Sequence, residues 1–135
     1  MNLSAAEQAL IRAAREARTH AYAPYSGYAV GAAVLADDGR VFAGCNVENA
    51  SYGLSVCAER VAVFGAAAAG AQRLVAAAVC TPDGGTPCGA CRQVLLEFAA
   101  APDQFTVWVV SPAHVIARYT LTELLPHGFQ LARGE

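Results

Sequence analysis

The sequence contains no lysine, little charge and no clustered basic segment. All nine basic residues among the 135 are arginine, charged residues make up 15%, and the formal net charge is −2. Only Arg12, Arg15 and Arg18 lie close together, and their helical spacing indicates a solvated face. Nucleic-acid-binding proteins normally carry a clustered basic surface that displaces counterions, so we expect no nucleic-acid partner.

The sequence also lacks long apolar runs and a leader segment. No stretch approaches the roughly 18 apolar residues that span a bilayer, and residues 1–12 have neither a basic n-region nor an apolar h-region. We therefore expect no membrane partner and a cytoplasmic protein. Hydrophobic residues make up 56% of the chain, and its length is that of one domain with its own core. A single domain over residues 1–135 is expected.

The chain has five cysteines, an odd count that argues against a disulfide framework. In a reducing compartment, clustered cysteines more often bind metal or take part in chemistry. Three of the five lie in two short strings, Cys57-Ala58-Glu59 and Pro87-Cys88-Gly89-Ala90-Cys91. Cys45 and Cys80 lie in apolar runs typical of strands and are predicted to be small buried hydrophobic residues.

Periodicity and turn signals predict helices and strands in the order α-β-β-α-β-α-β-β-α. A capping box at 4–7 begins a helix that continues to about Ala21, and a second box at 120–123 begins a short final helix. Two further helices are expected at 57–69 and 88–100, with strands at 28–35, 41–46, 74–80, 105–110 and 115–119. This order predicts an α/β fold, a three-layer α/β/α sandwich with one mixed sheet of roughly five strands. In the helix at 57–69, one apolar stripe is expected to contain Cys57, Val61, Phe64 and Ala68.

The two cysteine strings offer three thiolates and one carboxylate at the starts of two helices. Catalytic zinc sites use three protein ligands and leave a fourth position for water, whereas structural sites are closed by four ligands. The partial positive charge of a helix N-terminus also lowers the pKa of a thiol there. We therefore predict that Cys57, Cys88 and Cys91 bind Zn²⁺ and that Glu59 acts as the proton carrier.

Three thiolates leave excess negative charge at a zinc ion. Arg60 and Arg92, each adjacent in sequence to a residue of the predicted site, are candidates to offset it by hydrogen bonds to sulfur. Two other interpretations stay open: a redox dithiol, and a structural zinc module in which Cys45 or Cys80 is the fourth ligand. The three histidines, His20, His114 and His127, lack ligand spacing and are not expected to bind metal.

Over nearly its whole length the chain resembles the small, homotetrameric, zinc-dependent cytidine deaminases. The matching strings are Tyr22-Ala23-Pro24-Tyr25-Ser26, Val30-Gly31-Ala32-Ala33, the segment 44–52, Cys57-Ala58-Glu59-Arg60, Pro87-Cys88-Gly89-Ala90-Cys91-Arg92-Gln93 and Leu124-Leu125-Pro126. The resemblance implies an enzyme of pyrimidine salvage with one Zn²⁺ per subunit. Such an enzyme hydrolyses cytidine and 2′-deoxycytidine to uridine and 2′-deoxyuridine and releases ammonia.

The resemblance also implies roles within one subunit. Asn46 and Glu48 match positions that hydrogen-bond the ribose 3′-hydroxyl, and buried polar groups of this kind would reject free cytosine. The backbone amide of Ala58 resembles the group that holds the pyrimidine carbonyl. Arg60 matches an arginine that hydrogen-bonds the zinc thiolates, in agreement with the charge argument.

Other roles implied by the resemblance cross between subunits. Ala50 and Tyr52 would contact the nucleoside 5′-hydroxyl from a neighbouring chain, and Phe129 would stack on the pyrimidine. Considered alone, Phe129 could instead be a C-terminal hydrophobic residue packed on its own core. Tyr28 departs from the family, which usually has a phenylalanine packing near the base, and its hydroxyl requires a partner.

Two other classes of deaminase substrate fit the sequence less well. Deaminases of the blasticidin S type share the Cys-Ala-Glu and Pro-Cys-Gly-x-Cys-Arg-Gln strings, but the string Asn46-Val47-Glu48-Asn49 favours a ribosyl substrate. A polynucleotide substrate is disfavoured by the absence of a basic groove and by the short chain.

Overall fold

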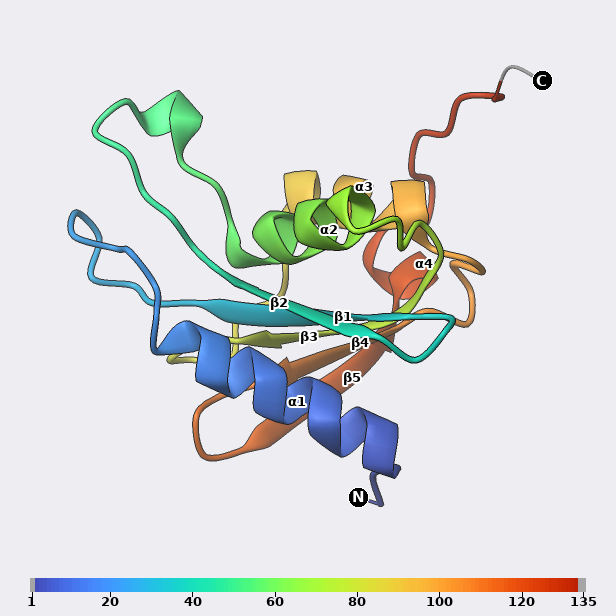
Figure 1. The fold of residues 1–135 in the computed structure, drawn as a ribbon, viewed down its shortest axis with the longest axis horizontal. Helices are drawn as coiled ribbons and strands as arrows, with labels where there is room; N and C mark the ends of the chain where they lie inside the picture. The colour runs from blue at the N-terminus through green and yellow to red at the C-terminus, as the bar shows by residue number, and fades with distance from the viewer. Residues whose placement is uncertain (1, 134–135) are drawn as a thin grey trace.

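One five-stranded mixed sheet forms the centre of the fold in the computed structural model, which describes residues 2–133 (Figure 1). Its strand order is β2-β1-β3-β4-β5. Only β3 and β4 pair in parallel, whereas the other neighbouring strands are antiparallel. The strands are β1 (Gly31–Ala36), β2 (Val41–Cys45), β3 (Leu74–Cys80), β4 (Thr106–Val110) and β5 (Val115–Thr120).

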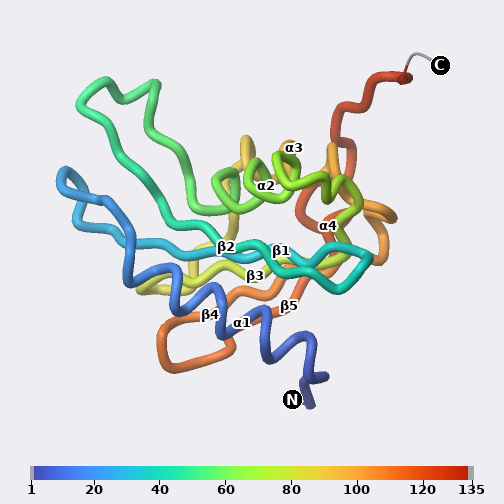
Figure 2. Tube along the Cα trace, viewed as in Figure 1, coloured from blue at the N-terminus to red at the C-terminus, as the bar shows by residue number. Residues whose placement is uncertain are grey.

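Helices cover both faces of this sheet, so the predicted three-layer α/β/α sandwich is confirmed (Figures 1 and 2). Helix α1 (Ala5–Arg18) covers one face, and α2 (Ala58–Ala68), α3 (Gly89–Phe98) and α4 (Leu121–Leu124) lie over the other. Each face has its own apolar cluster. Leu10 of α1 packs near Trp108 on one side, and Val63 of α2 packs near Leu95 on the other.

Both capping boxes form as predicted. The Ser4 hydroxyl accepts from the Glu7 amide at 3.1 Å while the Glu7 carboxylate accepts from the Ser4 amide at 2.8 Å. The same reciprocal pair begins α4 at Thr120 and Glu123. Such caps satisfy amide groups that have no partner inside a helix, and each contributes about 1 kcal/mol.

Strand β1 begins at Gly31 rather than at Tyr28, because a side chain replaces the strand ladder over residues 28–30. The Asn46 side-chain oxygen accepts from the Val30 amide at 2.9 Å, and its amide nitrogen donates to the Tyr28 carbonyl at 2.8 Å. The Asn46 backbone amide also donates to the Val30 carbonyl at 3.1 Å, and Arg18 donates to the Ala29 carbonyl at 2.8 Å. The backbone before β1 is therefore held mainly by Asn46, 16 residues away from Val30 in sequence.

The apolar stripe expected on α2 does not face the core. Phe64 is 49% exposed, and the buried positions are Ala58, Glu59, Ala62, Val63 and Ala66. Because α2 is apolar around most of its circumference, periodicity could not select the inward face. A close approach of β2 selects it: a Cβ at Gly44 would lie 2.6 Å from the Ala62 nitrogen. This contact places the N-terminus of α2 over the sheet edge.

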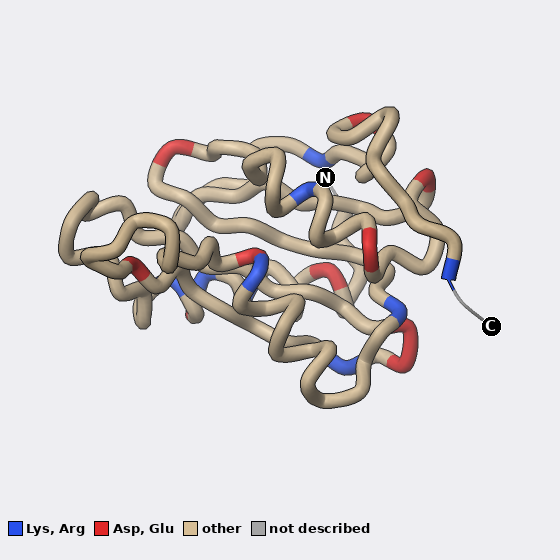
Figure 3. The backbone as a smooth tube through the Cα atoms, turned by 90° about the horizontal axis from the view of Figure 1, so that it is seen from above, with Lys and Arg blue, Asp and Glu red and all other residues tan. Residues whose placement is uncertain are grey.

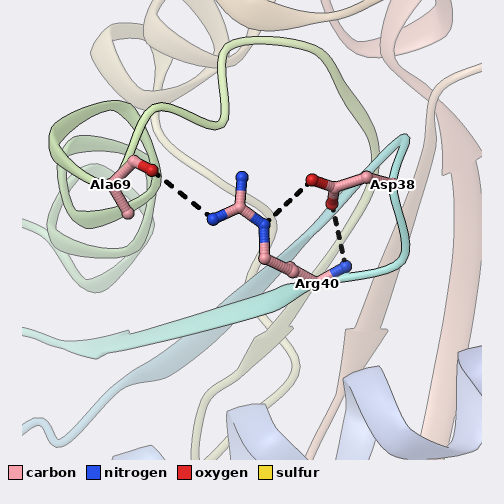
Figure 4. A network of polar contacts seen from close by, with 3 residues as sticks. All are labelled: Asp38, Arg40 and Ala69. Carbon is pink, nitrogen blue, oxygen red and sulfur yellow. Dashed lines mark hydrogen bonds and ion pairs between the residues drawn. The ribbon is translucent and has the colours of Figure 1, made fainter.

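Charged residues are scattered along the backbone, as the sequence predicted (Figure 3). Three exposed ion pairs occur among residues 2–133, and exposed pairs of this kind contribute little to stability. In one of them Arg40 contacts Asp38 at 2.9 Å in the β1–β2 turn and donates to the Ala69 carbonyl after α2 (Figure 4). Within the same residues, none of the helices has the length and apolarity that a membrane crossing requires.

Candidate metal centre and active site

Three cysteine sulfur atoms meet where α2 and α3 begin. Cys57 and Cys88 are the N-cap residues of α2 and α3, and Cys91 lies in the first turn of α3. The three sulfur atoms lie within 4.8 Å of one another. Thiolates bound tetrahedrally at about 2.3 Å from zinc lie about 3.8 Å apart, so the cluster fits a zinc ion. Within residues 2–133, neither Cys45 nor Cys80 belongs to this group.

The surroundings of Cys57 favour its thiolate form. Cys57 has a pKa lowered to about 5, first by a hydrogen bond from the Cys91 thiol and then by Arg60. The Arg60 Nη2 atom lies 3.5 Å from the Cys57 sulfur. The pKa of Cys91 is raised, because its proton is shared with Cys57 and the site excludes water. A divalent cation would replace that shared proton, and its charge would be offset by the thiolates.

Arg92 does not contact the cysteine sulfur atoms, so the expectation that it offsets thiolate charge by hydrogen bonds is wrong. Its guanidinium donates to the carbonyls of Pro87 and Leu124 at 2.7 Å each and to the Thr86 hydroxyl at 2.9 Å. These bonds tie the loop before α3 to the end of α4. Arg92 therefore positions Cys88 through the backbone.

Glu59 lies beside the cysteine cluster on the buried face of α2. Its side chain is 6% exposed. Burial, assisted by the charge of Cys57, raises the pKa of Glu59 above its ordinary value. A carboxyl group whose pKa is shifted towards neutrality can both accept and donate a proton at physiological pH.

Glu59 opens onto a cavity of about 300 Å³. One wall is formed by the segment 26–30 with Asn46 and Glu48, and the opposite wall by the loop 81–88; Ala58 and Val79 complete the lining. The amide of Ala58 is in the first turn of α2, where amides have no intrahelical partner. The cavity therefore combines a buried carboxyl, a helix N-terminus and the metal-binding cysteines.

The two polar residues predicted to bind ribose both lie in this cavity and are held by backbone contacts. Asn46 is fixed by the two bonds to residues 28 and 30 described above. Glu48 accepts from the amides of Tyr25 and Ser26 at 3.0 and 3.2 Å, and also from the Ser26 hydroxyl. The Ser26 hydroxyl is the main reason that the pKa of Glu48 is lowered. A preset, ionised carboxylate is suited to accept from a hydroxyl group.

Ala50, Tyr52 and Phe129 lie outside the cavity of their own chain. Tyr52 is 85% exposed and belongs to a short 3-10 helix, Tyr52–Leu54, that the sequence did not predict. The segment around it projects away from the sheet (Figure 1). The Phe129 backbone is held by two reciprocal bonds to the Gln93 side-chain amide, yet its ring is 66% exposed. Packing of this ring on its own core is therefore excluded.

A polar network in the loop 81–88 was not predicted. Thr81 is 4% exposed, and its hydroxyl accepts from the amides of Gly84 and Gly85 at 2.7 and 2.9 Å. Asp83 accepts from the Tyr28 hydroxyl at 2.5 Å, which supplies the partner that this tyrosine requires. Only the Pro/Gly content of the segment marked it as a loop.

Comparisons with known proteins agree with this site. The model of the cytidine and deoxycytidylate deaminase zinc-binding region matches residues 4–106. A cytidine deaminase of Halalkalibacterium halodurans is 48% identical over 124 residues, covering 90% of this chain and 92% of the relative. One from Mycobacterium tuberculosis is 46% identical over 120 residues, covering 87% and 85%.

A solved structure leads to the same family. The crystal structure of the cytidine deaminase from Burkholderia pseudomallei matches this fold with a TM-score of 0.85 and 46% sequence identity, covering 94% of this chain and 100% of that one. The fold, the three-cysteine cluster and the relatives agree on one conclusion. The chain belongs to the zinc-binding cytidine deaminase family and is an enzyme that deaminates cytidine.

Proposed function

We propose that the cavity lined by Glu59 binds one cytidine or 2′-deoxycytidine and that Glu59 carries the protons of its hydrolytic deamination. The observation that carries this assignment is a buried carboxyl with a raised pKa, adjoining three clustered cysteine sulfur atoms at the wall of a nucleoside-sized cavity. Cytosine C4 would lie next to Glu59, with the amino group directed towards the cysteine cluster.

Each step of the chemistry then has a residue to perform it. Zinc held by Cys57, Cys88 and Cys91 would supply a Lewis acid that lowers the pKa of water to about 7. Glu59 accepts a proton from the attacking water and donates it to N3 of the base. It then accepts the second proton and gives it to the departing amino group, which leaves as ammonia. Water and cytidine thereby become uridine and ammonia.

Binding of the sugar and the base uses preset polar groups. Glu48 and Asn46 hydrogen-bond the ribose 3′-hydroxyl, and the Ala58 amide donates to the pyrimidine carbonyl oxygen. The contacts of Asn46 and Glu48 with residues 25–30 support this proposal, because side chains that are already held lose little entropy on binding. A ligand without ribose would leave both groups unpaired.

A substrate panel tests the nucleoside assignment. Cytidine and 2′-deoxycytidine are expected to be deaminated, with kcat/KM for free cytosine lower by about a thousandfold or more. The fall in ultraviolet absorbance as the amino group is lost gives the rates. Turnover of blasticidin S with no turnover of cytidine would contradict the proposal, and so would equal kcat/KM values for cytosine and cytidine.

The enzyme is further proposed to be a homotetramer whose pockets are shared between subunits. Large apolar side chains stay uncovered in the single chain, among them Tyr52 (85%), Leu54 (66%), Phe64 (49%) and Phe129 (66%). Because exposed apolar surface of this extent is typical of interfaces, association of several copies accounts for it. Ala50, Tyr52 and Phe129 would then complete the pocket of a neighbouring chain.

Mixing two inactive variants tests the shared pocket. In Glu59→Gln the proton carrier is lost, whereas in Phe129→Ala the stacking ring is lost. If the ring acts on a neighbouring chain, random reassembly of equal amounts should restore about one quarter of wild-type activity, because half of the sites keep Glu59 and half of those receive Phe129. Activity that stays at the mean of the two variants would show that Phe129 acts on its own chain. Sedimentation gives the number of subunits.

Location and partners follow from the same residues. Five free cysteines, three of them needed as thiolates, are suited to a reducing compartment, so the cytoplasm is the proposed location. Scattered arginines and a net charge of −2 argue for a small-molecule substrate rather than a nucleic acid.

A further inference from the structure

The Tyr28 hydroxyl connects the two walls of the cavity. Tyr28 lies in the wall formed by 26–30, and its hydroxyl donates to an Asp83 carboxylate oxygen of the opposite loop at 2.5 Å. The two residues are 55 positions apart in the sequence. Tyr28 is 38% exposed, so the bond lies at the mouth of the cavity.

The wall that carries Tyr28 is held firmly by other contacts. The Tyr28 amide donates to the Ser26 hydroxyl at 3.0 Å, and the Tyr28 carbonyl accepts from the Asn46 side chain at 2.8 Å. Glu48 in turn binds the amide of Ser26. The Tyr28 ring therefore extends from a fixed backbone.

The opposite loop is held by contacts of its own, and in one of them Asp83 accepts from the Thr81 hydroxyl at 3.3 Å. Thr81 binds the amides of Gly84 and Gly85 near the start, and Arg92 binds Thr86 and Pro87 near the end. Between them, Asp83 provides the bond to the other wall.

The loop backbone also packs against the tyrosine hydroxyl. A Cβ built at Gly85 would lie 3.4 Å from the Tyr28 Oη, which is ordinary van der Waals contact, so the loop backbone lies directly beside this hydroxyl. The Tyr28 hydroxyl is the main reason that the pKa of Asp83 is lowered, and Asp83 adds to the effect of burial that raises the pKa of Tyr28. A protonated phenol therefore faces an ionised carboxylate at neutral pH.

We propose that Tyr28 is a positioning residue whose hydrogen bond to Asp83 holds the loop 81–88 against the segment 26–30 and thereby sets the width of the nucleoside cavity. This inference rests on the proposed function of that cavity. Loss of the bond detaches the loop from the segment 26–30, while Thr81 still holds Gly84 and Gly85 and Arg92 still holds the residues next to Cys88. The fraction of protein with a closed cavity falls, and apparent affinity falls with it. The chemical step in the closed cavity is unchanged.

Tyr28→Phe in the zinc-loaded enzyme tests the proposal, since it removes one oxygen and keeps the ring. KM for cytidine is expected to rise by about threefold to tenfold, with kcat within about twofold and zinc per chain unchanged. A merely structural role would instead lower kcat, through loss of active protein, and leave KM unchanged. Unchanged KM in Tyr28→Phe overturns the proposal.

Three further variants sharpen the result. Asp83→Ala removes this bond and also the one from the Thr81 hydroxyl, so its KM should rise at least as much as in Tyr28→Phe. The double variant should be no worse than Asp83→Ala alone, because the bond between the walls is already lost there. Asp83→Asn keeps an acceptor oxygen, so its KM for cytidine should lie closer to that of the wild type than to that of Asp83→Ala. Tyr119→Phe is the matched control: Tyr119 lies on β5, and its hydroxyl makes no hydrogen bond to any residue between 2 and 133. Fully additive effects of Tyr28→Phe and Asp83→Ala would overturn the proposal.

Hydrogen exchange without substrate separates this inference from the proposed function. The amides of Gly84 and Gly85 should exchange faster in Tyr28→Phe than in the wild type, whichever nucleoside the enzyme prefers. Unchanged exchange overturns the role of the bond even if cytidine is turned over. Failure of the wild type to act on cytidine, with faster loop exchange in the variant, would overturn the assigned substrate alone.

Discussion

Glu59→Gln is expected to lower kcat for cytidine by about a hundredfold to ten-thousandfold, the range in which a positioned acid–base group contributes. Glutamine occupies nearly the same volume, so the buried face of α2 should pack as before. Its amide cannot accept a proton from water or deliver one to N3. Stopped-flow or steady-state ultraviolet assays give the rate, and metal analysis shows whether one zinc per chain is retained.

The chain offers a matched control for this substitution. Glu97 lies on α3 and pairs with Arg133 at 3.6 Å on the exposed surface, away from the cavity. Glu97→Gln makes the same chemical change and should leave kcat and zinc content unaltered. The pKa of Glu59 is raised mainly by burial, and an exposed acid such as Glu97 lacks that burial. Such an acid therefore cannot take over the role of Glu59. Near-normal turnover by Glu59→Gln would contradict the assigned proton carrier.

Cys91→Ser is expected to abolish both zinc binding and deamination. The Cys91 side chain is 0% exposed and lies 3.4 Å from the Cys88 sulfur, so no other ligand of this chain can take its place. A serine hydroxyl stays protonated at neutral pH and binds zinc weakly compared with thiolate. Zinc per chain should fall from about one to near zero, and Tm should fall because metal binding favours the folded state.

Cys45→Ser is the control that also separates a catalytic site from a closed structural one. Cys45 is half-buried in β2, and its sulfur is directed to the His20 carbonyl at 3.4 Å. The variant should keep zinc and activity, since three ligands and an open position suffice for catalysis. Loss of zinc in Cys45→Ser would instead indicate that this residue closes a structural site.

Much of the fold was predictable because its signals are local. The two capping boxes and the alternation of apolar segments each depend on a few neighbouring residues. The order of elements then leaves few topologies that bury both faces of one sheet. The zinc ligands were predictable for a related reason, since clustered cysteines at these spacings more often bind metal than pair in disulfides.

The features that sequence reasoning missed depend on contacts between distant segments. The inward face of α2 is selected by the close approach at Gly44, which no helical period encodes. The late start of β1 results from Asn46, and Arg92 binds carbonyls of Pro87 and Leu124 instead of sulfur. A charged residue adjacent to a ligand in sequence need not be adjacent to it in space.

The roles that the resemblance assigns to Tyr52 and Phe129 differ in kind from the features set by contacts within the chain. Their side chains are 85% and 66% exposed in the single chain, so one subunit alone gives them nothing to bind. Residues that act on a neighbouring copy have no signal in the contacts of their own chain. Their roles therefore remain predictions, and the mixing experiment tests that of Phe129.

The most direct test of the account is the deamination of cytidine by the purified protein before chelation, after chelation and after zinc is restored, with zinc counted per chain at each stage. We predict one zinc per chain with rapid loss of cytidine absorbance, no turnover after chelation, and recovery in proportion to the zinc rebound. Undiminished turnover by protein that contains no zinc would contradict the assignment of Cys57, Cys88 and Cys91 to a catalytic metal centre.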